Sequence, residues 1–312
     1  MSQASSRSRH RLGTRGSKLA RTQARMVADE LASTAAIDCE IVIVKTSGDR
    51  IQDRPLADVG GKGLFTKELE ESLLNGDIDL AVHSMKDVPA ELPPGLSIAA
   101  ILPREDVRDA FLSPVAATLG ALPKGARIGT SSVRRAAQVA RARSDLEILP
   151  LRGNVDTRLA KLDAGTFDAI LLAFAGLKRL GLESRITSLL PIDTWLPALS
   201  QGAVGIEIAT RDDAIVEALR RVNDSTSEIA LACERAFQLA LDGSCRTAIG
   251  GLATVTGGVL QFRGEVLAPN GDDFAQTEFR ITLGAAPLEE AQAAGRDAGL
   301  ALKPRAAAWL KI

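Results

Sequence analysis

Aromatic residues are scarce in this sequence: they make up 3% of the chain, and tyrosine is absent. Proteins that bind single-stranded nucleic acid stack bases on aromatic side chains, so the composition argues against that class. Lys+Arg number 38 and Asp+Glu number 39, which gives a net charge of -1 at pH 7. Nucleic-acid-binding domains carry a basic excess, so no nucleic-acid partner is expected. A balanced total does not decide whether basic residues gather locally.

Histidine and cysteine are also rare. The chain has 2 His, at His10 and His83, and 3 Cys, at Cys39, Cys233 and Cys245. Two histidines exclude a multi-histidine metal site, and we expect no metal. The cysteines are widely spaced and odd in number, which excludes a disulfide framework and a CxxC metal motif. This usage is typical of a reducing compartment.

Long apolar runs are missing as well. No stretch reaches the roughly 18 apolar residues that a membrane-spanning helix needs. The segment Met1–Arg11 lacks the apolar core of a secretory signal. We therefore expect a cytoplasmic protein with no membrane partner. The chain has 312 residues, and at about 100–200 residues per domain this length predicts two or three domains.

Strand-like and helix-like segments alternate over the first two-thirds of the chain. A crossing marked by Pro103–Asp106 divides this region into two stretches. Alternation of this kind predicts two α/β domains with mostly parallel sheets, separated by a cleft. Strands are expected near Leu12 and over 39–45, 79–83, 96–102, 127–129, 146–149, 167–172 and 203–209, and helices over 18–31, 66–74, 133–143 and 155–162.

The last third has a different pattern. A helix over 226–241 is followed by short strands over 248–255, 259–267 and 274–283 and by a helix over 288–300. The turn sequence Pro269–Asp272 is typical of a hairpin. This region therefore predicts an α+β domain with a small antiparallel sheet.

Basic side chains recur where the expected strands end or the expected helices begin. Helix N-termini favour anions, and the planar guanidinium matches carboxylates. Any one arginine is as readily a solvated surface residue, but the repeated placement predicts a ligand with several carboxylates or phosphates. The residues concerned are Arg15, Lys62, Lys86, Arg134, Arg135, Arg152, Arg158 and Arg179.

Two other residues carry candidate chemistry. Asp87 follows Lys86 directly after an expected buried strand. A single central carboxylate there would stabilise a developing cation or exchange a proton, or else it caps a turn before proline. Cys245 lies in a glycine-containing loop beside Arg246, where a thiolate with a lowered pKa is favoured. Cys39 and Cys233 are expected to be inert core thiols, and His83 a packed residue.

Several unusual motifs occur together and in order from Leu12 to Gly250. In this order and spacing the chain resembles the porphobilinogen deaminase family, also called hydroxymethylbilane synthase. The motifs are Gly13–Ser17, Val59–Phe65, His83–Pro89, Gly129–Arg135, Leu151–Asn154, Gln201–Ala203 and Gly243–Cys245. The chain departs from the family pattern at Asp58, Ser200 and Arg246–Ala248, none of which has a proposed chemical role.

The resemblance implies two domains like those of periplasmic binding proteins, flanking a cleft, and a third α+β domain. With it we expect one α/β domain over 1–102 plus 203–222, a second over 103–202, and the α+β domain over 223–312. The resemblance also implies a monomeric transferase of tetrapyrrole and haem biosynthesis. It joins four porphobilinogen units head to tail with loss of ammonia on a covalent dipyrromethane cofactor, then releases hydroxymethylbilane.

Site residues follow from the matching motifs. Asp87 would be catalytic, and Cys245 would hold the dipyrromethane through a thioether. The other residues implied to bind the cofactor are Lys86, Thr130, Ser132, Arg134, Arg135 and Arg158. Those implied to bind the substrate are Arg15, Ser17, Gln23, Lys62, Phe65, Arg152, Arg179 and Gln201.

Two alternatives use the same arginines. A non-catalytic binding protein for a polycarboxylate would need neither Asp87 nor Cys245. A ligand-sensing domain of a transcription regulator would need a helix-turn-helix segment ahead of Leu12, which the sequence lacks.

Overall fold

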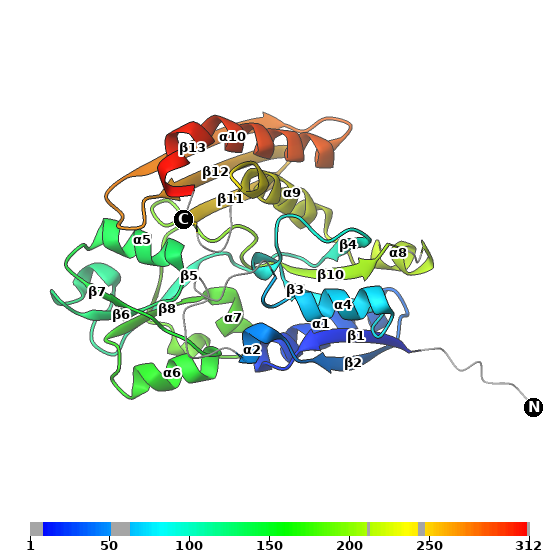
Figure 1. Cartoon of the computed structure of the whole chain (residues 1–312), viewed down its shortest axis with the longest axis horizontal. Coiled ribbons are helices and arrows are strands. Elements are labelled where there is room, and N and C mark those ends of the chain that lie inside the picture. The colour runs from blue at the N-terminus through cyan, green and yellow to red at the C-terminus, as the bar shows by residue number, and fades with distance from the viewer. Residues whose placement is uncertain (1–8, 51–62, 211–212, 243–246, 311–312) are drawn as a thin grey trace, which may run out of the picture.

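The computed structural model describes residues 9–50, 63–210, 213–242 and 247–310. Its strands form two five-stranded sheets and one three-stranded sheet, with helices packed on them (Figure 1). Both five-stranded sheets belong to the α/β part of the chain, and the three-stranded sheet is antiparallel. The predicted fold class is therefore confirmed.

The first sheet has the strand order β2-β1-β3-β10-β4. β1 runs parallel to β2 and β3, whereas β10 runs antiparallel to both β3 and β4. Four of its strands therefore point the same way. They are β1 (His10–Arg15), β2 (Cys39–Val44), β3 (Leu80–Ser84) and β4 (Leu96–Ile101), and the reversed strand is β10 (Val204–Ala209).

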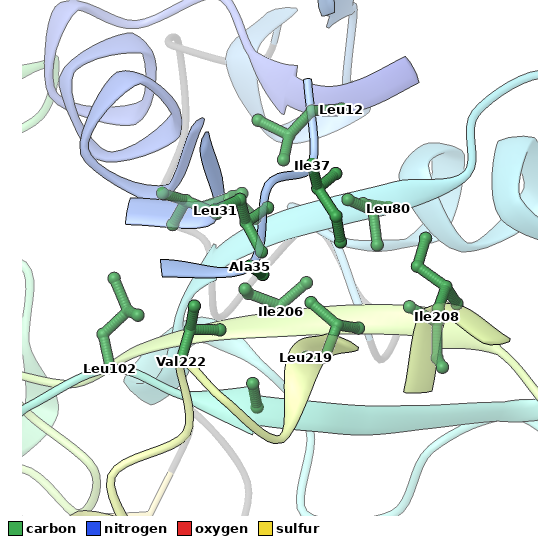
Figure 2. Packing of buried hydrophobic residues seen from close by; sticks show 14 of the residues in the cluster. Leu12, Leu31, Ala35, Ile37, Leu80, Leu102, Ile206, Ile208, Leu219 and Val222 are labelled. Atoms are coloured by element: carbon green, nitrogen blue, oxygen red, sulfur yellow. The ribbon is translucent and has the colours of Figure 1, made fainter. Parts of the chain in front are cut away.

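Helices α1 (Lys18–Thr34), α2 (Ser47–Arg50), α4 (Lys67–Asn75) and α8 (Asp213–Leu219) accompany this sheet. α1 buries Ala24, Val27 and Leu31, which recur at helical spacing on one face. Figure 2 shows α1, α8 and strands of this sheet meeting, with Leu31, Leu80 and Ile206 directed into one aliphatic cluster. Packing of this face fixes the ends of β1 and β3, where candidate site residues lie.

The second sheet has the order β7-β6-β8-β5-β9 and repeats the arrangement of the first. Its strands are β5 (Asp109–Leu112), β6 (Arg127–Gly129), β7 (Glu147–Leu149), β8 (Ala169–Ala173) and β9 (Ser188–Leu189), and its helices are α5 (Val133–Ala142), α6 (Val155–Asp163) and α7 (Phe174–Arg179). Here β5 is the reversed strand. Neither β5 nor β9 was among the predicted strands, because both are short and lack alternation.

The chain passes twice between the two sheets. The first passage joins β4 to β5 through Arg104, and the second joins β9 to β10 through Ser200 and Gln201. After each passage, the first strand that the chain forms is the reversed strand of the sheet that it enters, β5 or β10. Short 3-10 turns complete this part: η1 (Met85–Asp87), η2 (Leu119–Ala121) and η3 (Glu183–Arg185).

The C-terminal part packs α9 (Ser225–Ala240) and α10 (Pro287–Leu310) with β11 (Ile249–Thr256), β12 (Val259–Leu267) and β13 (Phe274–Thr282). α10 continues well beyond its predicted end and contains Pro304. Proline in a helix interior costs about 3 kcal/mol, but Leu302 and Ala306 on either side of it are buried in the core, and that packing offsets the loss.

Polar contacts join the C-terminal part to the rest of the chain. Glu234 on α9, which is fully buried, accepts from Arg104 Nη1 at 2.7 Å and from the backbone N–H of Ser200 at 2.5 Å. Arg235 donates to the carbonyls of Val88 at 3.3 Å and Pro89 at 2.7 Å. Helix α9 is thereby held against both passages and against the loop that follows Asp87. Within the described ranges, no helix is both long and apolar enough to cross a membrane.

Candidate functional site

Asp109 is the centre of a buried cluster of charged and polar side chains. Its side chain is 0% exposed. Oδ2 accepts from Arg134 Nη2 at 2.8 Å and from Trp195 Nε1 at 2.9 Å, and Oδ1 accepts from Arg135 Nη2 at 2.6 Å and from Gln201 Nε2 at 2.8 Å. Burial alone would raise the pKa of Asp109, but Arg134 and Arg135 hold it well below its ordinary value.

The start of α5 fixes this arginine pair. β6 ends at Gly129, and Ser132 caps the helix by accepting from the backbone N–H of Arg135 at 3.4 Å. Thr130 Oγ1 in turn accepts from the backbone N–H of Ser132 at 3.2 Å. Thr130 and Ser132 thus set where the helix begins, and Arg134 and Arg135 follow in its first turn.

Lys86 and Asp87 lie in η1, directly after β3. Lys86 Nζ donates to Gln201 Oε1 at 3.3 Å. Burial and the charges of Arg135 and Arg134 lower the pKa of Lys86 to about 8. The negative charge of Asp87 opposes these effects, because it favours the charged forms of both Lys86 and Arg158. Within the described ranges, no hydrogen bond is made to its carboxylate.

Two further arginines approach this group from the start of α6. Arg158 Nε donates to the carbonyl of Gly153 at 2.8 Å. Burial, together with the charges of Arg135 and Arg152, lowers the pKa of Arg158 to about 10. Gly153 has φ 110°, in the left-handed region, and a Cβ there would lie 2.7 Å from the Thr157 side chain. Glycine is required for the turn that brings these like charges together.

A second set of candidates comes from β1 and α1. Arg15 ends β1, and its guanidinium lies 4.0 Å from the ring centroid of Phe65. Ser17 caps α1 by accepting from the backbone N–H of Ala20 at 3.3 Å. Gln23 is buried and donates to Ser84 Oγ at 2.9 Å. Ser84 is the last residue of β3, and Lys86 and Asp87 follow it in η1.

Arg179 ends α7 and reaches the second passage. Its Nη2 donates to the carbonyl of Gly202 at 2.6 Å, next to Gln201. Burial lowers the pKa of Arg179. His83 is packed beside this region with Nε2 2.9 Å from Glu207 Oε2, which confirms the prediction of a packed histidine.

The structure therefore brings together Lys86, Asp87, Arg134, Arg135, Arg152, Arg158 and Gln201. The expectation of a single central carboxylate was wrong, because Asp109 is a second one. Its sequence signal was weak: an aspartate before the short apolar run Ala110–Leu112, whose burial the pattern did not reveal. One clue was available: several buried arginines need a carboxylate inside the protein as a counter-ion, so a second acidic residue could have been expected. Lys62 and Cys245 lie outside the described residues.

The charge balance of this group fits a ligand with several carboxylates. Five of its side chains are cationic, against the carboxylates of Asp87 and Asp109. Burial, and after it repulsion from neighbouring arginines, lowers the pKa of Lys86 and of Arg158. Buried Nε atoms without a hydrogen-bond partner in the described ranges occur on Arg134, Arg135 and Arg179. Cationic groups of this kind are stabilised when an anion binds.

Comparison with known proteins identifies the family. A model described as the porphobilinogen deaminase dipyromethane cofactor binding domain matches residues 10–217, and one for the porphobilinogen deaminase C-terminal domain matches residues 229–304. The chain is 52% identical over 298 residues to a porphobilinogen deaminase of Nitrobacter hamburgensis, covering 95% of this chain and 93% of that protein. It is 50% identical over 305 residues to the chloroplastic porphobilinogen deaminase of Pisum sativum, covering 95% and 81%.

Solved structures give a weaker likeness. A putative methionine-binding lipoprotein from Bacillus subtilis superposes with a TM-score of 0.43 at 11% identity, covering 70% of this chain and 92% of that one. A nutrient binding protein from Burkholderia cenocepacia bound to methionine gives a TM-score of 0.43 at 13% identity, covering 70% and 92%.

Proposed function

This chain belongs to the porphobilinogen deaminase family, and we propose that one set of its site residues binds the cofactor and another binds the substrate. We call these two sets the cofactor side and the substrate side. The enzyme polymerises porphobilinogen in tetrapyrrole biosynthesis, with loss of ammonia at each addition, and releases hydroxymethylbilane. A dipyrromethane cofactor belongs to this family, and when bound it supplies the primer for the growing chain.

The cofactor side would consist of residues of η1, of α6, and of α5 and the segment just before it. Lys86, Arg134, Arg135 and Arg158 would bind carboxylates of the dipyrromethane, with Thr130 and Ser132 fixing the start of the helix. The buried, partnerless Nε atoms of Arg134 and Arg135 and the excess of positive charge support this assignment. Attachment to the Cys245 sulfur is part of the same proposal.

The substrate side would consist of residues from several separate segments of the chain. Arginine forks and amides there would bind the acetate and propionate groups of porphobilinogen and of the lengthening chain. These residues are Arg15, Ser17, Gln23, Lys62, Phe65, Arg152, Arg179 and Gln201. The stacking of Arg15 on Phe65 supports the proposal because it holds one guanidinium in place.

Asp87 would be the catalytic residue. When the C–N bond of porphobilinogen breaks, nitrogen leaves as ammonia and the methylene carbon is left electron-deficient, in conjugation with the pyrrole nitrogen. The Asp87 carboxylate would stabilise that positive charge. It would then accept the proton that is lost as the new C–C bond forms. Two observations support this assignment. The Asp87 carboxylate favours the charged forms of both Lys86 and Arg158, and within the described ranges it accepts no hydrogen bond.

The direct experiment follows ammonia. Incubation of the purified protein with porphobilinogen should release one ammonia for each porphobilinogen consumed. Consumption without ammonia, or no consumption at all, would contradict the proposed function.

We further propose the domain division 1–102 plus 203–222, 103–202 and 223–312. The three sheets support it, because β10 joins the first sheet after the chain has passed through the second. A cytoplasmic monomer without nucleic-acid or membrane partners completes the proposal, and the balanced charge of -1 supports the part of it that concerns nucleic acid.

A further inference from the structure

A continuous chain of buried polar side chains runs from the C-terminal sheet to the arginine pair. Glu265 on β12 begins it, and its Oε1 accepts from Gln138 Nε2 at 2.8 Å. Gln138 Oε1 accepts from Arg134 Nη1 at 2.7 Å, and Arg134 Nη2 donates to Asp109 at 2.8 Å. These four residues are at most 3% exposed.

The same chain is braced by the backbone. The carbonyl of Leu196 accepts both from Gln138 Nε2 at 2.9 Å and from Arg134 Nη1 at 2.9 Å. Buried polar networks with satisfied partners are rigid, and removal of one member leaves the next with an unsatisfied group. Glu265 and Arg134 are thus both hydrogen-bonded to the same Gln138 amide.

Close packing surrounds this link. The hairpin turn between β12 and β13 lies against α5, where a Cβ on Gly271 would come within 2.6 Å of the carbonyl oxygen of Ala137. Leu267 and Ala248 also pack on Ala137. Glu265 Oε2 accepts from Arg141 Nη1 at 3.0 Å, so the same carboxylate holds α5 at a second point that does not lead to Arg134.

We propose that Glu265 is a positioning residue: through Gln138 it fixes the guanidinium of Arg134. The position of the C-terminal domain against α5 thereby determines the geometry of the cofactor side of the site. This inference rests on the proposed function. It assigns Glu265 no contact with substrate or cofactor. The link joins the domain that carries Cys245 to the arginines proposed to bind the group on that cysteine.

The structure offers matched variants that separate the two arms of Glu265. Gln138→Met keeps the volume and the Glu265–Arg141 ion pair but breaks the link to Arg134. Arg141→Ala removes the ion pair and keeps the link. Glu265→Gln retains an oxygen acceptor for Gln138, whereas Glu265→Leu does not.

Steady-state kinetics of the holoenzyme form the first readout. Gln138→Met and Glu265→Leu should each lower kcat by about fivefold or more while KM for porphobilinogen stays within about twofold. Arg141→Ala and Glu265→Gln should stay within about twofold of wild type in both constants. The Gln138→Met/Glu265→Leu double variant should be no slower than the slower single variant, because both changes break one link.

Tryptophan fluorescence gives a readout that does not depend on turnover. The sequence has 2 Trp, and Trp195 Nε1 donates to Asp109 Oδ2 at 2.9 Å. In a Trp309→Phe background, Gln138→Met should shift the emission of Trp195, and Arg141→Ala should not.

A wild-type kcat or an unchanged Trp195 emission in Gln138→Met would overturn the proposal. So would losses in kcat that multiply in the double variant. If Glu265→Leu does not fold, Gln138→Met decides the matter alone. A wild-type protein that does not turn over porphobilinogen would instead contradict the proposed function, so the two failures are distinguishable.

Discussion

Asp109 and Arg135 form a buried ion pair, with Oδ1 of the carboxylate 2.6 Å from Nη2 of the guanidinium. Arg134 shares the same carboxylate through Oδ2 at 2.8 Å. One negative charge therefore faces two positive ones inside the protein. The unbalanced positive charge destabilises the folded protein when no anion is bound. By linkage, an anion that binds there stabilises the fold.

Replacement of Asp109 tests this arrangement. Asp109→Asn should lower the free energy of unfolding by about 3–5 kcal/mol, because it leaves two buried guanidinium groups without a counter-ion. Urea denaturation measures the change. Glu217→Gln, which removes an exposed carboxylate paired with Arg220, is the control and should unfold like wild type. Equal stability of Asp109→Asn and the control would contradict this interpretation.

The same carboxylate predicts a pH dependence. The pKa of Asp109 is lowered in the folded protein, so its contribution to stability is fully present above the unfolded-state pKa of about 3.9 and is lost as the pH falls toward the folded-state value. The stability difference between wild type and Asp109→Asn should therefore be constant near neutral pH and shrink in acid. A difference that grows below pH 4 would be inconsistent with the ion pair.

The charge of Lys86 should have the opposite effect on stability, because its lowered pKa means that the charge destabilises the folded protein, whereas the charge of Asp109 stabilises it. The folded-state pKa of Lys86 is lowered to about 8 from the ordinary lysine value of 10.5, so the folded protein binds fewer protons than the unfolded chain between these values. Lys86→Gln should be more stable than wild type at pH 7, and wild type should recover the difference as the pH rises from 8 to 10.5. Unfolding titrations across that window measure it. A gap that widens with pH would show that Lys86 is stabilised by its neighbours.

Asp87 should matter for turnover and little for the fold. Asp87→Asn should reduce kcat by about 100-fold or more, since it removes the charge that stabilises the developing cation and accepts the proton. The variant should still fold, because no hydrogen bond in the described ranges depends on the carboxylate, and the loss of its charge beside Lys86 and Arg158 should lower the melting temperature only slightly. Asp145→Asn, which removes a surface carboxylate paired with Arg143, is the kinetic control. Near-normal kcat in Asp87→Asn would remove it from the mechanism.

Periodicity predicted the architecture well because each α/β unit has its own signals. The Ser132 cap, the apolar face of α1 and the left-handed Gly76 after α4 all act locally, and these helices lie where they were predicted, over 133–143, 18–31 and 66–74. β5 escaped prediction because its four residues make sense only as a strand between β8 and β9.

The candidate site shows the same limit. Motifs in the sequence named the arginines, but they did not name Asp109, Gln138 or Glu265, which become partners only when three separate segments pack together. Long-range pairing of buried polar groups leaves no periodic trace. The structure was needed to find the counter-ion and the link to the C-terminal sheet.

The cysteines allow the sharpest test of the site. Burial and the carboxylates of Asp38 and Asp79 raise the pKa of the Cys39 thiol to about 11, and burial and Glu234 raise that of Cys233. Neither forms a thiolate readily at neutral pH, so neither is suited to covalent attachment. Cys245 is left as the proposed attachment point.

The mass of the intact, purified protein measures this most directly. Wild type, Cys39→Ser and Cys233→Ser should each exceed the mass of the bare polypeptide by one dipyrromethane group, and Cys245→Ser should not. A Cys245→Ser protein that still carries the added mass, or a wild-type protein that lacks it after expression in a host that makes the group, would contradict the assignment of the site.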